Sequence, residues 1–221
     1  MLPSSKHLTL TSLPQPQFLN KFYLFSPNQE TKLMVHDFFR SFELFSENEI
    51  EEFLKLFEIR KVNKNEYFIQ EGEKCREVAF IQSGIFRSFY LADDGKDMTY
   101  CFRFPNTMMA AYSSFISGCL SKESMQAITD AELLILKKEK MDALVQDKLN
   151  WMKFLKIIAE QEYLELENRF FQLQRDSATQ RYSALLKNYP DYIQKIPLQY
   201  LASYLGITQR HLSRIRKEIS F

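Results

Sequence analysis

Residues 149–174 contain neither proline nor glycine and keep a helical spacing of apolar side chains, which constrains the fold more than any other feature of the sequence. Six apolar residues follow one another at intervals of four and three: Leu155, Ala159, Tyr163, Leu166, Phe170 and Leu173. Such a seam is typical of helices that pair as coiled coils. At 1.5 Å per residue this helix would be about 39 Å long, whereas the strands of a small sheet span roughly 17–20 Å.

Two interpretations of this helix stay open. In the first, it packs only on the sheet of its own chain. In the second, one face covers that sheet and the seam pairs with the same seam of a second copy. The length favours the second interpretation, because a small sheet cannot cover the whole helix. The sequence therefore predicts a homodimer.

The segment that precedes this helix has the pattern of a β structure. Between residues 60 and 138, the turn signals "NKNE", "EGEK", "QSG", "ADDGKD" and "FPN" separate short apolar runs such as "VAFIQ", "IFRSFYL" and "ELLILK". Short strands at regular spacing predict a small antiparallel sandwich or roll. Ahead of them, Ser46 and Glu49 form a capping box that opens a short amphipathic helix.

The last part of the chain has the pattern of a helix-turn-helix. Residues 198–205 favour a helix, and Gly206 stands where the chain must turn in a left-handed conformation. Thr208 caps a second helix, and Ala202 is small at the point where the two helices would cross. An inner stripe would pack the second helix onto the first: Ile207, Leu212 and Ile215.

The outer face of the second helix carries side chains that suit DNA. Gln209, Arg210 and Arg214 are of the types that bond base edges in the major groove. Thr208, His211, Ser213 and Lys217 can contact phosphate. The alternative interpretation is an ordinary solvated hairpin with a basic face. The joint placement of turn, inner stripe and outer face favours a helix-turn-helix that binds double-stranded DNA.

The distribution of charge agrees with a C-terminal DNA site. The whole chain has a formal net charge of only +1. From residue 177 onwards seven cations face two carboxylates, a balance of about +5, so the rest carries about −4. A polyanion should therefore approach the C-terminal end.

Several other classes of protein are disfavoured. The three cysteines show no metal-ligand spacing, and no run approaches the roughly 18 apolar residues of a membrane span, so we expect a cytoplasmic protein without metal, cofactor or membrane. The three histidines, His7, His36 and His211, are scattered, and we expect no enzyme. A rival function is a small-molecule sensor or protein-docking module, whose terminal hairpin would bind a protein; exposed apolar anchors would favour it.

Taken together, the roll with "EGEK", "FIQSGIFRSFYLADDGKDM" and "FPN", the long helix, and the end "IPLQYLASYLGITQRHLSRIRKEI" resemble regulators of the Crp/Fnr family, the relatives of cyclic-AMP receptor protein. The resemblance implies an α+β fold and four parts: an extension (1–33), a jelly-roll-like effector domain (34–148), a dimerisation helix (149–174) and an all-α DNA reader (175–221). It also implies transcription regulation on an inverted repeat and RNA polymerase as a partner. Base reading then falls on Gln209, Arg210 and Arg214.

The sequence departs from the family pattern in two places. The reader domain of the family usually continues into a β-hairpin wing, whereas this sequence ends at Phe221. In the nucleotide pocket, the Gly-Glu pair that holds the ribose aligns with Ala110 and Ala111, and the Arg-Ser pair that holds the phosphate aligns with Glu123 and Ser124. A carboxylate repels phosphate, so cyclic AMP is not the expected effector.

The pocket is thus either adapted to another, unknown small molecule or no longer used, and both interpretations stay open. The residues of this candidate effector pocket are Met108, Met109, Ala110, Ala111, Tyr112, Lys122, Glu123 and Ser124. Lys122 would have to replace the lost arginine as a point charge. Methionine and aromatic side chains at these positions could also be ordinary core.

Overall fold

The structure is a computed structural model that describes residues 31–219. Residues 1–30 of the predicted extension lie outside the described residues. Helix α2 (Thr31–Arg40) begins ahead of the predicted boundary at residue 34.

Eight strands of the described chain form two four-stranded antiparallel sheets, in the orders β1-β8-β3-β6 and β2-β7-β4-β5. Their bounds are β1 (Glu58–Val62), β2 (Tyr67–Ile69), β3 (Glu77–Ser83), β4 (Phe86–Leu91), β5 (Asp97–Arg103), β6 (Met108–Met109), β7 (Ser124–Ala127) and β8 (Ala131–Lys137). The sheets face each other across an apolar core, since alternate side chains of each strand point to opposite faces. This confirms the predicted antiparallel roll.

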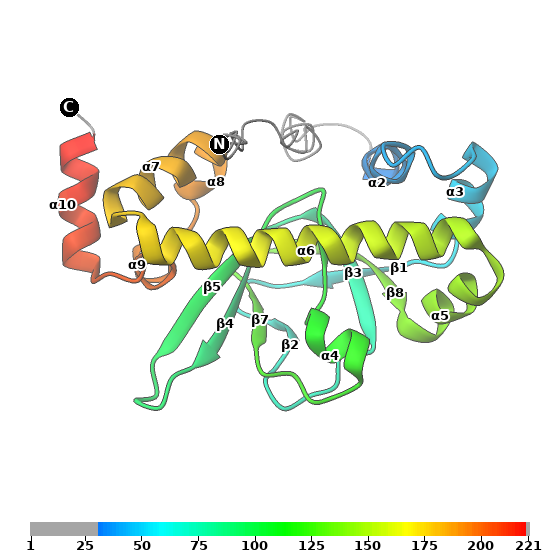
Figure 1. Ribbon diagram of the computed structural model, residues 1–221, viewed down its shortest axis with the longest axis horizontal. Helices are drawn as coiled ribbons and strands as arrows, with labels where there is room; N and C mark the ends of the chain where they lie inside the picture. Colours follow the sequence, from blue (N-terminus) through cyan, green and yellow to red (C-terminus); the bar gives the residue numbers. More distant parts are fainter. Residues whose placement is uncertain (1–30, 220–221) are drawn as a thin grey trace, which may run out of the picture.

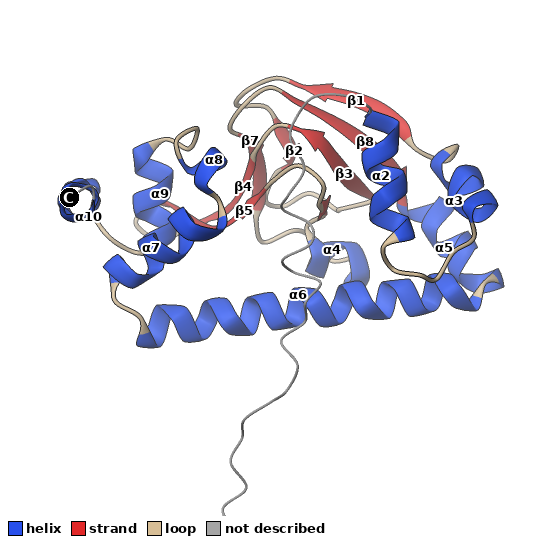
Figure 2. Cartoon of the chain, turned by 90° about the horizontal axis from the view of Figure 1, so that it is seen from above, coloured by secondary structure: helices blue, strands red, loops and turns tan. Residues whose placement is uncertain are grey.

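The helices surround the roll and extend it at one end (Figure 1). They are α3 (Glu47–Leu54), α4 (Tyr112–Ser117), α5 (Lys138–Asp147), α6 (Leu149–Arg175), α7 (Ala178–Asn188), α8 (Pro190–Ile193), α9 (Leu198–Leu205) and α10 (Gln209–Ile219). Helix α6 runs along most of the length of the molecule, with α3 and α5 near its start, α7 to α9 beside its last turns and α10 beyond its end (Figures 1 and 2). The predicted class, α+β with a long helix between a roll and a helical C-terminal part, is confirmed.

Most local predictions of helix boundaries hold, and one needs correction. Helix α6 ends one residue beyond the predicted Gln174, at Arg175. Pro190 opens the short helix α8, since the N–H that proline lacks would have no partner in the first turn of a helix. Helix α4, which interrupts the roll between β6 and β7, was not predicted.

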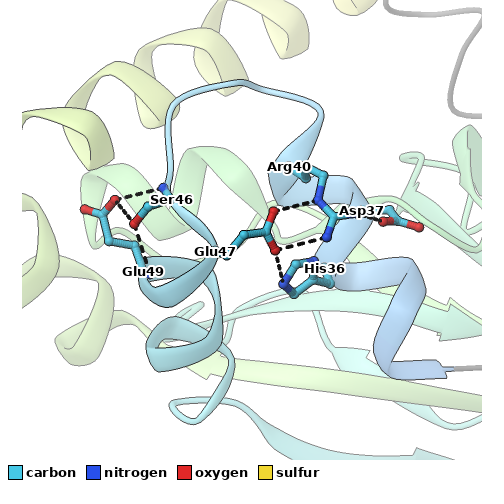
Figure 3. Close-up of polar contacts among 6 residues, drawn as sticks. All are labelled: His36, Asp37, Arg40, Ser46, Glu47 and Glu49. Atoms are coloured by element: carbon cyan, nitrogen blue, oxygen red, sulfur yellow. Dashed lines mark hydrogen bonds and ion pairs between the residues drawn. The ribbon is translucent and has the colours of Figure 1, made fainter.

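The first two described helices are joined by polar contacts (Figure 3). The guanidinium of Arg40 donates to both carboxylate oxygens of Glu47, at 2.8 and 3.0 Å, and His36 Nε2 lies 3.1 Å from the same carboxylate. The predicted capping box is present, since the Ser46 N–H donates to the Glu49 carboxylate at 2.9 Å. These contacts are largely exposed, so each contributes little, and packing holds the helices in place.

That packing is an aromatic cluster between α2, α3 and the start of α6. The Phe39 and Phe53 rings lie 4.8 Å apart, and the Phe53 ring lies 4.0 Å from Trp151. Trp151 and Phe154 are almost fully buried, which anchors the first turns of α6 on the roll.

A second core lies beside strand β5 of the sheet β2-β7-β4-β5. Phe102 of β5 and Phe104 just after it pack with Leu201 and Leu205 of α9 and with Leu185 of α7. The C-terminal helices and the roll therefore share buried apolar surface.

Candidate nucleic-acid interface

Helices α9 and α10 meet at a sharp turn centred on Gly206. This residue has φ +67°, a left-handed conformation that glycine adopts without steric cost. The Gly206 N–H donates to the Ser203 carbonyl and the Ile207 N–H to the Ala202 carbonyl, both at 3.0 Å. These bonds satisfy carbonyls at the end of α9 that the helix leaves without a partner.

The inner stripe of α10 fixes its orientation on α9. Leu212 and Ile215 are buried, and they belong to one core cluster with Leu201, Ala202 and Leu205. Since Ala202 is small, the two helices can approach closely, as the sequence predicted. The Thr208 hydroxyl accepts the His211 N–H at 3.2 Å and so caps the start of α10.

The outer face of α10 points to solvent. Gln209, Arg210, His211, Arg214 and Lys217 are exposed, while Ser213 is half-buried and donates its hydroxyl to the Gln209 carbonyl at 3.0 Å. Within residues 31–219, no carboxylate lies within ion-pair distance of Arg210, Arg214 or Lys217. The structure thus brings the predicted DNA residues together on one convex face whose cations are available to a partner.

Two arginines that the sequence analysis did not single out support this hairpin. Arg181 of α7 donates to the Leu205 carbonyl at 2.7 Å, and Arg169 of α6 donates to the Tyr204 carbonyl. The Arg169 guanidinium also lies 3.7 Å from the centre of the Tyr204 ring. Burial lowers the pKa of Arg169. Cations at a helix C-terminus are favourable. Arg181 and Leu205 are 24 residues apart in the sequence, and Arg169 and Tyr204 are 35 apart, so no local sequence pattern predicts these contacts.

The residues of the predicted dimer seam differ in solvent exposure along α6. Leu155 and Ala159 are half-buried, and Leu155 packs against the core of the roll. The four remaining seam residues are exposed: Tyr163 (63%), Leu166 (64%), Phe170 (57%) and Leu173 (46%). A stripe of large apolar side chains this exposed is unusual on the surface of a monomer.

Four of the eight residues of the candidate effector pocket line one cavity. Met108, Met109, Ala110 and Tyr112 line a small cavity of about 40 Å³ against α6. Ala111 is buried in the core and Lys122 is exposed. The Ser124 hydroxyl is already used, because it accepts the Glu71 N–H at 3.0 Å.

Glu123 immediately precedes β7 and accepts a hydrogen bond from the Tyr100 hydroxyl. Burial raises the pKa of the Glu123 carboxyl and of the Tyr100 phenol. Nearby, Arg103 at the end of β5 pairs with Glu162 of α6 at 2.7 Å and with Glu165 at 3.5 Å, which ties the roll to the helix. The exposed Lys122 is not placed to act as a phosphate fork.

Comparison with known proteins agrees with this architecture. Residues 59–148 match the family model of the cyclic nucleotide-binding domain. Over 98 residues, the chain is 29% identical to the anaerobic regulatory protein of Bacillus subtilis (strain 168), a match that covers 44% of this chain and 41% of that protein. The matched region therefore spans about two fifths of the relative's length.

Solved structures resemble the chain over most of its length. FixK2 from Bradyrhizobium japonicum has a TM-score of 0.66 at 19% identity, covering 74% of this chain and 84% of that one. A Crp/Fnr family protein from Eubacterium rectale also scores 0.66, at 16% identity over 83% and 88%. The catabolite activator protein of Thermus thermophilus scores 0.52, at 21% identity over 80% and 84%.

Residues 59–148 match the cyclic nucleotide-binding domain, and the chain has the fold of solved Crp/Fnr structures, so the predicted resemblance to that family is confirmed. Within residues 31–219, no helix is long and apolar enough to cross a membrane, and no group of three or more His, Cys, Asp or Glu side chains could hold a metal ion.

Proposed function

We propose that the protein is a sequence-specific DNA-binding transcriptional regulator that acts as a homodimer on an inverted repeat. One observation carries the proposal: the exposed outer face of α10 presents Gln209, Arg210 and Arg214, which form no ion pairs with residues 31–219, on a frame that buries Leu212 and Ile215. A helix with this profile fits the major groove, where arginine bonds guanine and glutamine bonds adenine.

The roles along the helix differ with position. The N-terminal part of a recognition helix points into the groove, so Gln209, Arg210 and Arg214 face base edges. Lys217 lies further along and reaches phosphate, as do Thr208, His211 and Ser213 near the helix start. The rival proposal of a protein-docking hairpin is not favoured, because the outer face of α10 offers polar side chains rather than apolar anchors.

The dimer supplies the two-fold symmetry that an inverted repeat requires. Pairing through the exposed seam of α6, centred on Leu166, would cover its apolar side chains and place the two α10 helices on half-sites one helical turn, about 34 Å, apart. Such a regulator works in the cytoplasm beside RNA polymerase, and both belong to the proposal.

Cyclic AMP is not part of this function. The positions that align with the ribose and phosphate ligands of the family hold Ala110, Ala111 and Glu123, and Glu123 is bonded to Tyr100. Losing several charge-assisted hydrogen bonds, each worth about 1.5–3 kcal/mol, lowers affinity by orders of magnitude. Titration calorimetry should detect no binding of cyclic AMP at micromolar concentration, and a micromolar Kd would refute this part.

The proposed function is tested by selecting bound duplexes from a random DNA pool with the full chain. Enrichment of an inverted repeat with half-sites about 10 base pairs apart, centre to centre, is expected. A pool that shows no enriched sequence, although the protein is folded and dimeric, would contradict sequence-specific binding.

A further inference from the structure

The DNA reader is attached to the roll at the free edge of a sheet. Strand β5 ends the order β2-β7-β4-β5, so one side of its backbone has no strand partner in the described chain. Ser203 of α9 fills this place. Its hydroxyl accepts the Thr99 N–H at 2.9 Å and donates to the Asp97 carbonyl at 3.1 Å. One side chain thus satisfies both a donor and an acceptor of the strand edge.

A buried cation strengthens the same contact. The Arg87 side chain of β4 is only 4% exposed, and its guanidinium lies between two rings, 4.0 Å from the centre of Phe89 and 3.7 Å from that of Tyr200 in α9. It also bonds Asp97 at 2.5 Å and Gln126 at 2.8 Å. A buried charge needs such partners, so Arg87 ties helix α9 to three strands of the sheet.

Strand β5, to which Ser203 is hydrogen-bonded, contains a β-bulge at Tyr100. Along the β4–β5 ladder, Ser88 pairs with Cys101 and Phe89 with Thr99, which leaves Tyr100 without a partner opposite it. Bulges redirect side chains and bend the strand. Here the extra residue sends its phenol to the Glu123 carboxylate beside β7. The residue just before it, Thr99, provides the N–H that Ser203 accepts.

We propose that Tyr100 and Glu123 are positioning residues for the DNA reader: their contact fixes the bulge in β5 and thereby holds the Thr99 N–H in place for Ser203 of α9. Because the bulge adjoins both contacts, loss of the Tyr100–Glu123 bond lets β5 relax and weakens the attachment of α9. A ligand or substitution at Glu123 would then alter the orientation in which α10 meets DNA. Only this consequence rests on the proposed function.

The attachment is tested first by amide hydrogen exchange at Thr99 in the full chain. Ser203→Ala removes the acceptor of this N–H, and exchange should rise by roughly fivefold, the equivalent of one ordinary hydrogen bond. Tyr100→Phe removes no partner of the Thr99 amide, yet a rise of similar size is expected. The double variant should exchange no faster than the faster single variant, since both changes release the same contact.

Matched controls separate this coupling from general loss of stability. Tyr90→Phe removes an exposed hydroxyl from the neighbouring strand, and Ser117→Ala removes one that bonds within α4, to the Ser113 carbonyl. Neither should change exchange at Thr99. Amides in β3 and β8, at the other sheet, should keep their protection in every variant that is folded.

Two results would overturn the inference. One is an unchanged Thr99 exchange rate in Tyr100→Phe, and the other is an additive rise in the double variant. Glu123→Ala removes the acceptor of the same hydrogen bond and tests the contact if Tyr100→Phe fails to fold. Hydrogen exchange is measured without DNA, so it tests the inference even if the protein binds no DNA. Conversely, if the protein binds DNA but Thr99 exchange does not depend on Tyr100, the inference fails and the proposed function is unaffected.

Discussion

At the scale of single residues, the proposed function assigns different roles to two cations of α10: one reads sequence and the other attracts DNA. Arg214 and Lys217 are both exposed on this helix, and no carboxylate of residues 31–219 lies within ion-pair distance of either. They are nearly one turn apart, so the proposed function assigns Arg214 to base edges and Lys217 to the backbone. The exposure of both side chains on one face could be predicted from the sequence, because spacing on a helix fixes the face.

Substitution of these two residues should therefore have different effects. Arg214→Ala should cost about 1–3 kcal/mol on the selected duplex and little on random DNA. Lys217→Ala should weaken both duplexes alike and reduce the salt slope by about one per subunit. Titrations of both variants at several salt concentrations measure the difference. Equal losses on specific and random duplexes for both variants would show that the assigned roles are wrong.

At the scale of secondary-structure elements, the turn between α9 and α10 depends on one glycine. A Cβ at Gly206 would have no heavy atom within 4 Å, so Gly206→Ala costs only the left-handed backbone, about 1–2 kcal/mol. Gly84 also has a positive φ, but a Cβ there would lie 2.4 Å from the Ala131 Cβ. Gly84→Ala should therefore cost more, roughly 2–5 kcal/mol. Urea unfolding of both variants tests this order, and similar losses would contradict it.

The seam of α6 gives a prediction at the same scale. Leu166 is 64% exposed in a single chain, and dimerisation through the seam would bury it. Leu166→Glu places a charge there and should yield monomers that have lost specific DNA binding, because a buried unpaired charge is costly. Leu91→Glu is the matched control, since Leu91 is 59% exposed at the tip of the roll, away from α6. If light scattering gives the Leu166→Glu variant the mass of the wild type, the seam is not the interface.

At the scale of the whole molecule, the sequence predicted the order of the parts but not how they touch. Turn signals, the long helix and the helix-turn-helix spacing are local, so they could be recognised directly. The attachment of α9 to β5 through Ser203, and the carbonyl contacts of Arg169 and Arg181, join residues far apart in sequence. Periodicity carries no information on such pairs. For the same reason the sequence could not show that the candidate effector residues include residues at a cavity, a half-buried carboxylate and a surface lysine.

The spacing of half-sites tests the central claim, a two-fold dimer whose α10 helices read DNA one helical turn apart. Affinity should be measured for the selected inverted repeat and for a duplex with about five base pairs, half a turn, inserted at its centre. We predict that the insertion reduces affinity nearly to that of random DNA, because the second helix then faces the wrong side of the duplex. An affinity unchanged by the insertion would contradict the claim.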